Sequence, residues 1–200
     1  SPVPAPKLLY EAIAQTPESS FVTVEGARIH YLRWGKRECP GILLVHGNAA
    51  HAYWWSFIAP FLARDYNVAA MDLSGMGDSD WRHFHADEAH GEAGGYSMEL
   101  FAREQMAVCE AAGMFVGTEP PVIVAHSFGG FVAMLTGGRY GDRLKGTVIL
   151  DSPVNPPVRF QGSGKVVPPV PRPHNIYPSL AAALARFRLM PPQSCENLFL

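Results

Sequence analysis

The sequence has little charge of either sign. Charged residues make up 17% of its 200 residues, and 16 Lys and Arg against 18 Asp and Glu leave a formal net charge of -2. A chain without a basic excess has no general electrostatic affinity for nucleic acid or for anionic membranes. The hydrophobic share of 48% is large enough to build a buried core, so the composition also excludes a disordered chain.

Long apolar runs, a secretory leader and paired cysteines are also lacking. No stretch reaches the roughly eighteen apolar residues of a membrane span, and Ser1–Pro6 has neither the basic nor the apolar segment of a signal peptide. We therefore expect a cytoplasmic protein that acts on neither membranes nor nucleic acid. Cys39, Cys109 and Cys195 form no C-x-x-C pair, and we expect buried thiols that bind no metal.

What the sequence does contain is a regular alternation of apolar runs and amphipathic segments. The apolar runs predict strands at residues 21–25, 28–34, 41–45, 67–72, 121–125 and 146–151. The amphipathic segments predict helices at 53–64, at 98–111 behind an N-cap at Ser97, at 128–139 and at 179–189. Because strands that are apolar at every position are covered on both faces, we expect an α/β fold. Its sheet should be doubly wound and mostly parallel, behind an antiparallel opening hairpin.

The composition changes after Asp151, where prolines recur through residues 152–192. We interpret residues 1–151 as the amino-terminal part of one core domain and residues 152–200 as the start of a cap or lid. The predicted strand at 147–150 is apolar throughout, which favours a position inside the sheet over one at its edge.

The first residues that point to chemistry follow the strand at 121–125. Ala125-His126-Ser127-Phe128-Gly129 is typical of a nucleophile elbow, in which a strand turns sharply into a helix with a serine at the corner. The pattern is usually G-x-S-x-G, and Ala125 departs from it by one methyl group. The positions two before and two after the serine must be small, because strand and helix nearly touch there. The alternative is that Ser127 only caps the helix.

A second motif, His46-Gly47-Asn48, follows the strand at 41–45. Acyl transfer passes through a tetrahedral oxyanion that needs two backbone donors. We expect these donors to be the N–H of Phe128, directly after the serine, and the N–H of Asn48. Gly47 lets the backbone approach closely, and His46 is expected to hold the turn.

These motifs occur in an order that resembles the α/β-hydrolase superfamily, among its bacterial esterase-like members. The resemblance runs from about residue 21 to about residue 153 and rests on His46-Gly47, Asp72–Ser79, Ala125–Gly130 and Leu150–Pro153. It implies a serine hydrolase without a cofactor, most simply a carboxylesterase, that forms an acyl-enzyme at Ser127. Asn48 and Phe128 would be its oxyanion donors, and its partner would be a small-molecule ester.

His46-Gly47-Asn48 together with Trp54 and Trp55 also resembles haloalkane dehalogenases, whose nucleophile is an aspartate. A serine at position 127 cannot form the alkyl-enzyme ester that this chemistry hydrolyses. The residues therefore argue against a dehalogenase and, for the same reason, against an epoxide hydrolase.

A serine nucleophile also needs a base and an acid. The superfamily places its histidine after the last strand, whereas here only His126 and His174 lie at or beyond the elbow, and neither suits the role. We expect that about a third of the domain, with the last strands and the histidine, lies outside this sequence. Asp151 is a candidate acid, with a helix cap or a loop anchor as alternatives. Asp72 and Asp78 are expected to form a turn.

Trp54, Trp55 and Trp81 are candidate substrate-binding residues, although packing on the sheet would explain the first two equally well. The loop at 83–90 opens like a metallo-β-lactamase zinc signature, but Glu88 stands where the next histidine is required, so no metal site is predicted. Two other functions stay open. One is a hydrolase-like sensor with slow turnover, and the other is a perhydrolase or lyase that uses the same elbow.

Overall fold

A computed structural model describes residues 6–82, 95–152 and 176–186. Its contacts divide the chain into two units, Ser1–Val154 and Asn155–Leu200. The helical elements of the first unit are α1 (Lys7–Ile13), η1 (Ala52–Trp55), α2 (Ala59–Leu62), α3 (Met98–Ala111), α4 (Phe128–Tyr140) and η3 (Gly141–Arg143). Its strands are β1 (Glu18–Val24), β2 (Ala27–Trp34), β3 (Gly41–Val45), β4 (Asn67–Met71), β5 (Val122–His126) and β6 (Gly146–Leu150). In the second unit the structure describes α5 (Leu180–Arg186), and the cap assignment of 152–200 stays a prediction.

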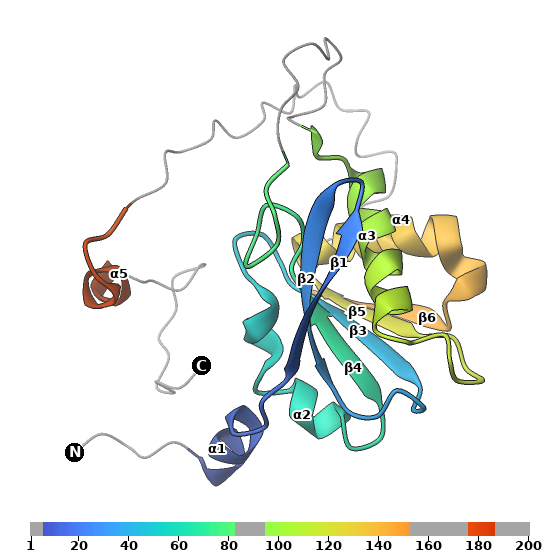
Figure 1. Ribbon diagram of the computed structural model, residues 1–200, viewed down its shortest axis with the longest axis horizontal. Coiled ribbons are helices and arrows are strands. Elements are labelled where there is room, and N and C mark those ends of the chain that lie inside the picture. The colour runs from blue at the N-terminus through green and yellow to red at the C-terminus, as the bar shows by residue number, and fades with distance from the viewer. Residues whose placement is uncertain (1–5, 83–94, 153–175, 187–200) are drawn as a thin grey trace. The chain divides into compact units, whose positions relative to one another are not determined.

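The described strands form one mixed sheet in the order β1-β2-β4-β3-β5-β6 (Figure 1). β1 and β2 are antiparallel and are joined by a two-residue turn at Glu25 and Gly26, both with positive φ, as a type I′ hairpin turn requires. β2 is also antiparallel to β4, and the remaining pairs are parallel. The predicted α/β fold, with an antiparallel opening hairpin before a parallel sheet, is confirmed.

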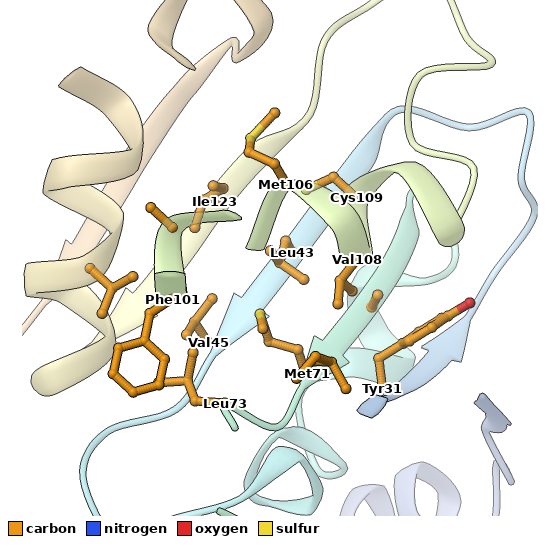
Figure 2. Packing of buried hydrophobic residues seen from close by; sticks show 14 of the residues in the cluster. Tyr31, Leu43, Val45, Met71, Leu73, Phe101, Met106, Val108, Cys109 and Ile123 are labelled. Atoms are coloured by element: carbon orange, nitrogen blue, oxygen red, sulfur yellow. The ribbon is translucent and has the colours of Figure 1, made fainter. Parts of the chain in front are cut away.

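Apolar residues of the central strands point alternately to two cores. Leu43 and Val45 of β3 belong to the core under α3 and α4, where they meet Phe101 and Val108 (Figure 2). Ile42 and Leu44 of the same strand face the second core, on the side covered by η1 and α2. Strands buried on both faces carry no polar alternation, which is why these runs are uniformly apolar.

The continuous helix predicted at 53–64 is wrong. The structure has a turn of 3-10 helix, η1, followed by the short α2, with Pro60 in its first turn. Pro60 has no N–H to bond the carbonyl four residues earlier, and its ring crowds that carbonyl, so one unbroken helix cannot form.

β6 stands at the edge of the described sheet. The interior position is expected together with further strands outside this sequence, so it stays a prediction. Val148 is 45% exposed and Leu150 is 39% exposed. An apolar strand sequence predicts that both faces of the strand can be buried. It does not predict which strands lie beside it in the sheet.

The described cysteines differ from each other. Cys109 is fully buried, and this burial raises the pKa of its thiol to about 12, whereas Cys39 is only half-buried, which corrects that part of the prediction. Cys195 lies outside the described residues. Within the described ranges, no helix is both long and apolar enough to cross a membrane.

Candidate active site

Ser127 occupies a sharp corner between β5 and α4. Its backbone has φ 51° and ψ -116°, a sparsely populated region for a residue with a Cβ atom. Such strain persists only where surrounding contacts enforce it, and it gathers at functional sites. The Ser127 side chain makes no capping hydrogen bond to α4, so a role as a simple helix cap is not supported.

The end of β6 holds this corner in place. The Ser127 amide donates to the Leu150 carbonyl over 3.0 Å, and the Ser152 hydroxyl donates to the Ser127 carbonyl over 2.8 Å. The Gly130 amide donates to the same carbonyl over 2.9 Å. The backbone of Ser127 is therefore fixed on both sides, while its hydroxyl is left free of these bonds.

The expected need for a small residue after the serine is met at Gly129, although its neighbour differs from the one predicted. A Cβ atom at Gly129 would lie 2.4 Å from the His46 carbonyl oxygen and 2.9 Å from Val45 Cγ1. The close approach is thus between α4 and the end of β3. On the other side of the serine, Ala125 is completely buried.

The His46-Gly47-Asn48 loop lies directly against the elbow. A Cβ atom at Gly47 would be 3.0 Å from Ser127 Cβ and 2.9 Å from His126 Nδ1. Among the described residues, the amides of Asn48 and Phe128 donate to no protein acceptor. Neither amide therefore has a competing bond within the described residues, and their role as oxyanion donors stays a prediction.

His46 is buried and braces this loop, in agreement with the expected structural role. Its Nε2 accepts from the Leu73 amide over 3.2 Å, so Nδ1 carries the proton and donates to the Gly47 carbonyl over 2.6 Å. Burial lowers the pKa of His46, which keeps the imidazole neutral and both bonds intact.

Asp72 does more than form the predicted turn. Its Oδ1 accepts from the Ala52 amide over 2.6 Å, and its Oδ2 accepts from the Asp78 amide over 3.0 Å and from His30 Nδ1 over 2.7 Å. Burial alone would raise the pKa of Asp72, but the bonds from His30 and the two amides together hold it below its ordinary value. The bond between His30 and Asp72 was not predicted, although a histidine at a core-facing strand position was the available signal.

The group His30, Asp72 and Asp78 has potential ligand atoms within 4.8 Å of one another. His30 Nδ1 and both Asp72 oxygens already take part in hydrogen bonds, so this grouping reads as a hydrogen-bonded network. The histidine-rich segment at 83–90 lies outside the described residues.

Two of the three predicted pocket tryptophans share a cavity near the elbow. Trp54, Trp55, Phe57, His126 and Leu150 line a cavity of about 200 Å³. The rings of Trp54 and His126 stack with their centroids 6.1 Å apart. Trp81 is 65% exposed and is not part of this lining.

Within the described residues, no base contacts the candidate nucleophile. No described histidine forms a hydrogen bond with the Ser127 hydroxyl, and His174 lies outside the described ranges. Asp151 directly follows β6 with φ 52° and an exposed side chain that has no partner in the described part of the chain. The site therefore combines an elbow and candidate oxyanion donors, and Asp151 remains a candidate acid.

The chain matches the alpha/beta hydrolase family over residues 42–199, and it belongs to that family. The match includes the strained Ser127 corner, the loop at 46–48 and the parallel strands that carry both.

Relatives within the family carry different names. Mouse "Epoxide hydrolase 4" is 27% identical over 128 residues, which cover 64% of this chain and 32% of that protein. "Lipase LipV" from Mycobacterium tuberculosis is 30% identical over 135 residues, which cover 68% of this chain and 44% of that protein. The chain thus spans about a third of the first relative and less than half of the second.

The solved structures that resemble this chain also carry different names. A membrane phospholipase A described as a bacterial virulence factor superimposes with a TM-score of 0.59 and 26% identity, covering 74% of this chain and 44% of that one. Epoxide Hydrolase A from Mycobacterium thermoresistibile gives a TM-score of 0.59 and 27% identity, covering 70% and 41%. Structures named as a phospholipase and as an epoxide hydrolase therefore both resemble this fold.

Proposed function

We propose that the protein is a serine hydrolase that cleaves carboxylic esters through an acyl-enzyme at Ser127. The observation that carries the proposal is the backbone of Ser127, which is strained and fixed while its hydroxyl makes no capping bond. A strained serine between a strand and a helix is the arrangement that presents a nucleophile to a carbonyl carbon.

The same geometry suggests how charge would be stabilised. Attack of the Ser127 oxygen on an ester would place negative charge on the former carbonyl oxygen. The free amides of Asn48 and Phe128 lie on the two segments that meet at this corner, and the N-terminus of α4 adds a favourable dipole. Loss of one such donor in an esterase costs roughly 100-fold or more in rate.

The identity of the nucleophile favours ester chemistry over epoxide opening. Related enzymes named epoxide hydrolases match the chain, but a serine cannot form and then release the alkyl-enzyme ester on which an aspartate-dependent enzyme relies. The lipase and phospholipase relatives are consistent with a serine at this position.

The cavity lined by Trp54, Trp55 and Phe57 favours an apolar group on the substrate, and its volume of about 200 Å³ suits a small or medium one. Phe57 and the two tryptophans provide no charged group that would select an ionic ester. Uncharged esters are therefore the proposed substrates, and a cytoplasmic location stays a prediction.

A slow, sensor-like protein is the second candidate, favoured by the lack of a described histidine at Ser127. We expect acylation of the 200-residue chain to be far slower than in an enzyme with its triad in place, because an unassisted serine is a weak nucleophile. Acylation of Ser127 at the speed of an intact triad would contradict this expectation.

The test follows the release of p-nitrophenolate from p-nitrophenyl butyrate in single-turnover experiments. We expect butyryl to be found on Ser127 by mass spectrometry together with one equivalent of released p-nitrophenolate. We expect the Ser127→Ala variant to lose the modification at this position and the release that accompanies it. Ser20→Ala, a substitution in β1, is the matched control and should retain them. Release from the unmodified chain without butyryl on Ser127 would overturn the esterase proposal. With the ester in excess, continued release would support the esterase, whereas release that stops after one equivalent would favour the sensor.

A further inference from the structure

A second serine, Ser19, belongs to a series of hydrogen-bonded side chains at the β1 edge of the sheet. Its Oγ lies 3.0 Å from Nε2 of His30, and Nδ1 of His30 lies 2.7 Å from Oδ2 of Asp72. His30 and Asp72 are each only 1% exposed, whereas Ser19 is exposed. β1 and β5 are separated in the sheet by β2, β4 and β3, so this hydrogen-bonded series is distinct from the Ser127 corner.

The hydrogen bonds of Asp72 indicate which nitrogen of His30 carries a proton. Asp72 accepts the amide protons of Ala52 and Asp78, and its depressed pKa keeps it ionised, so it can only accept from His30. Nδ1 of His30 therefore carries a proton, and the tautomer that this bond selects has its lone pair on Nε2. In that tautomer the hydroxyl of Ser19 donates to Nε2, and its oxygen keeps its lone pairs for solvent.

We propose that Ser19 is a second, activated serine that accepts acyl groups, with His30 as its general base and Asp72 as the residue that positions His30. A nucleophile bonded to a base that is itself oriented by an acid is the arrangement that activates serine, whatever the fold. Asp72 does not touch the reacting atoms. It holds the tautomer and stabilises the imidazolium that forms.

The edge position of β1 supplies an oxyanion donor. The Asp72 amide donates to the His30 carbonyl over 2.9 Å, so the backbone groups of His30 face β4. Backbone groups alternate along a strand, and the hairpin register sets Phe21 opposite His30 and Ser19 opposite Leu32. The Ser19 amide therefore points away from β2, to the open edge, where a nucleophile's own N–H can bind an oxyanion.

Two aromatic rings identify the acyl donors that would fit. The ring centroids of Phe21 and His30 lie 5.0 Å apart, and those of Tyr53 and His30 lie 6.5 Å apart. The side chains of Phe21 and Tyr53 are both nearly half exposed. They flank the base with apolar surface that is open to solvent. Activated esters with an aromatic leaving group are thus the expected reactants.

The proposed step is balanced in atoms and charge. Ser19 Oγ forms a bond to the carbonyl carbon of p-nitrophenyl acetate while its proton passes to His30 Nε2. The bond between that carbon and the p-nitrophenoxy oxygen then breaks. The leaving group takes the proton from His30, which yields acetyl-Ser19 and p-nitrophenol and returns the imidazole to its neutral form.

The test is independent of the proposed function because it uses the full chain with Ser127→Ala. The protein is mixed with p-nitrophenyl acetate, quenched at short times and mapped by mass spectrometry. We expect acetylation of Ser19 at least about 100-fold faster than that of Ser20, the neighbouring serine whose side chain lies on the other face of β1, because general-base assistance contributes about this much. We expect Ser20→Ala to leave the Ser19 rate unchanged.

His30→Gln supplies the decisive comparison, since glutamine keeps a side-chain hydrogen bond but cannot accept the proton. We expect it to lower Ser19 acetylation to the Ser20 rate with the circular dichroism spectrum retained. If the variant does not fold, the unmodified Ser127→Ala chain is compared with and without urea, and unfolding should abolish the preference for Ser19. Equal acetylation of both serines in the folded chain, or a preference that survives His30→Gln or urea, would overturn the proposal.

Discussion

At the scale of single residues, the corner at Ser127 depends on the absence of a side chain at Gly129. Ser127 adopts a positive φ despite its side chain, and the glycine two residues later permits the turn because α4 starts almost in contact with β3. A strained residue of this kind costs about 1 to 3 kcal/mol. The bonds from Leu150, Ser152 and Gly130 to its backbone offset that cost.

Gly129→Ala is expected to disturb this corner. The added Cβ atom would sit 2.4 Å from the His46 carbonyl oxygen, so α4 or the loop at 46–48 must shift. Overpacking of this kind costs about 1 to 3 kcal/mol, and urea unfolding measures it. Gly138→Ala in the same helix is the control, because nothing lies within 4 Å of its added Cβ atom and alanine favours a helix. Equal stability of the two variants would show that the close approach is not enforced.

At the scale of elements, α3 and α4 both follow a serine, but only one of the two serines caps its helix. Ser97 is extended, and its side chain accepts from the Leu100 amide over 3.1 Å, as the sequence predicted for an N-cap. Ser127 starts α4 without any such bond. A serine before a helix is thus compatible with either role, and the backbone angles and the capping bond separate them.

This difference predicts that replacing the serine by alanine costs more stability at Ser97 than at Ser127. Ser97→Ala should lower the free energy of unfolding by about 1 kcal/mol, because the Leu100 amide loses its partner. Ser127→Ala should change it by less, because no capping bond is lost. Thermal unfolding of both variants, followed by circular dichroism, checks the pair. A larger loss for Ser127→Ala would mean that its hydroxyl carries a structural bond.

At the scale of the whole molecule, Asp72 joins segments that are far apart in the sequence. Its carboxylate binds His30 of β2, the Ala52 amide at the start of η1 and the Asp78 amide in the turn after β4. These bonds tie the opening hairpin to the loop that precedes η1. The stability of the sheet and the shape of the candidate site therefore depend on one ionised group.

Asp72 predicts how stability changes with pH. Its folded-state pKa lies below the ordinary value of 3.8, so it stabilises the fold above that pH, and this contribution is lost as the pH falls through the folded-state pKa. Asp72→Asn should cost on the order of 3 kcal/mol at neutral pH. We expect this difference to shrink in acid, as measured by urea unfolding across a pH series.

Asp65→Asn is the control for the pH series, since Asp65 is exposed and its side chain has no hydrogen-bond partner among the described residues. It should cost little at any pH. A cost of Asp72→Asn that stays constant into acid would contradict the assignment of an ionised Asp72.

The sequence alone determined the alternation of strands and helices and the opening hairpin, and it predicted the corner at Ser127 beside the alternative of a simple helix cap. These features are local, because apolar periodicity, turn residues and small residues act on their immediate neighbours. Only the tertiary structure decided that β6 lies at the described edge, that Gly129 is crowded by β3 and that Ser19, His30 and Asp72 meet. Those contacts join residues from different strands, and their partners are set by the order in which the strands pack, which no single segment encodes.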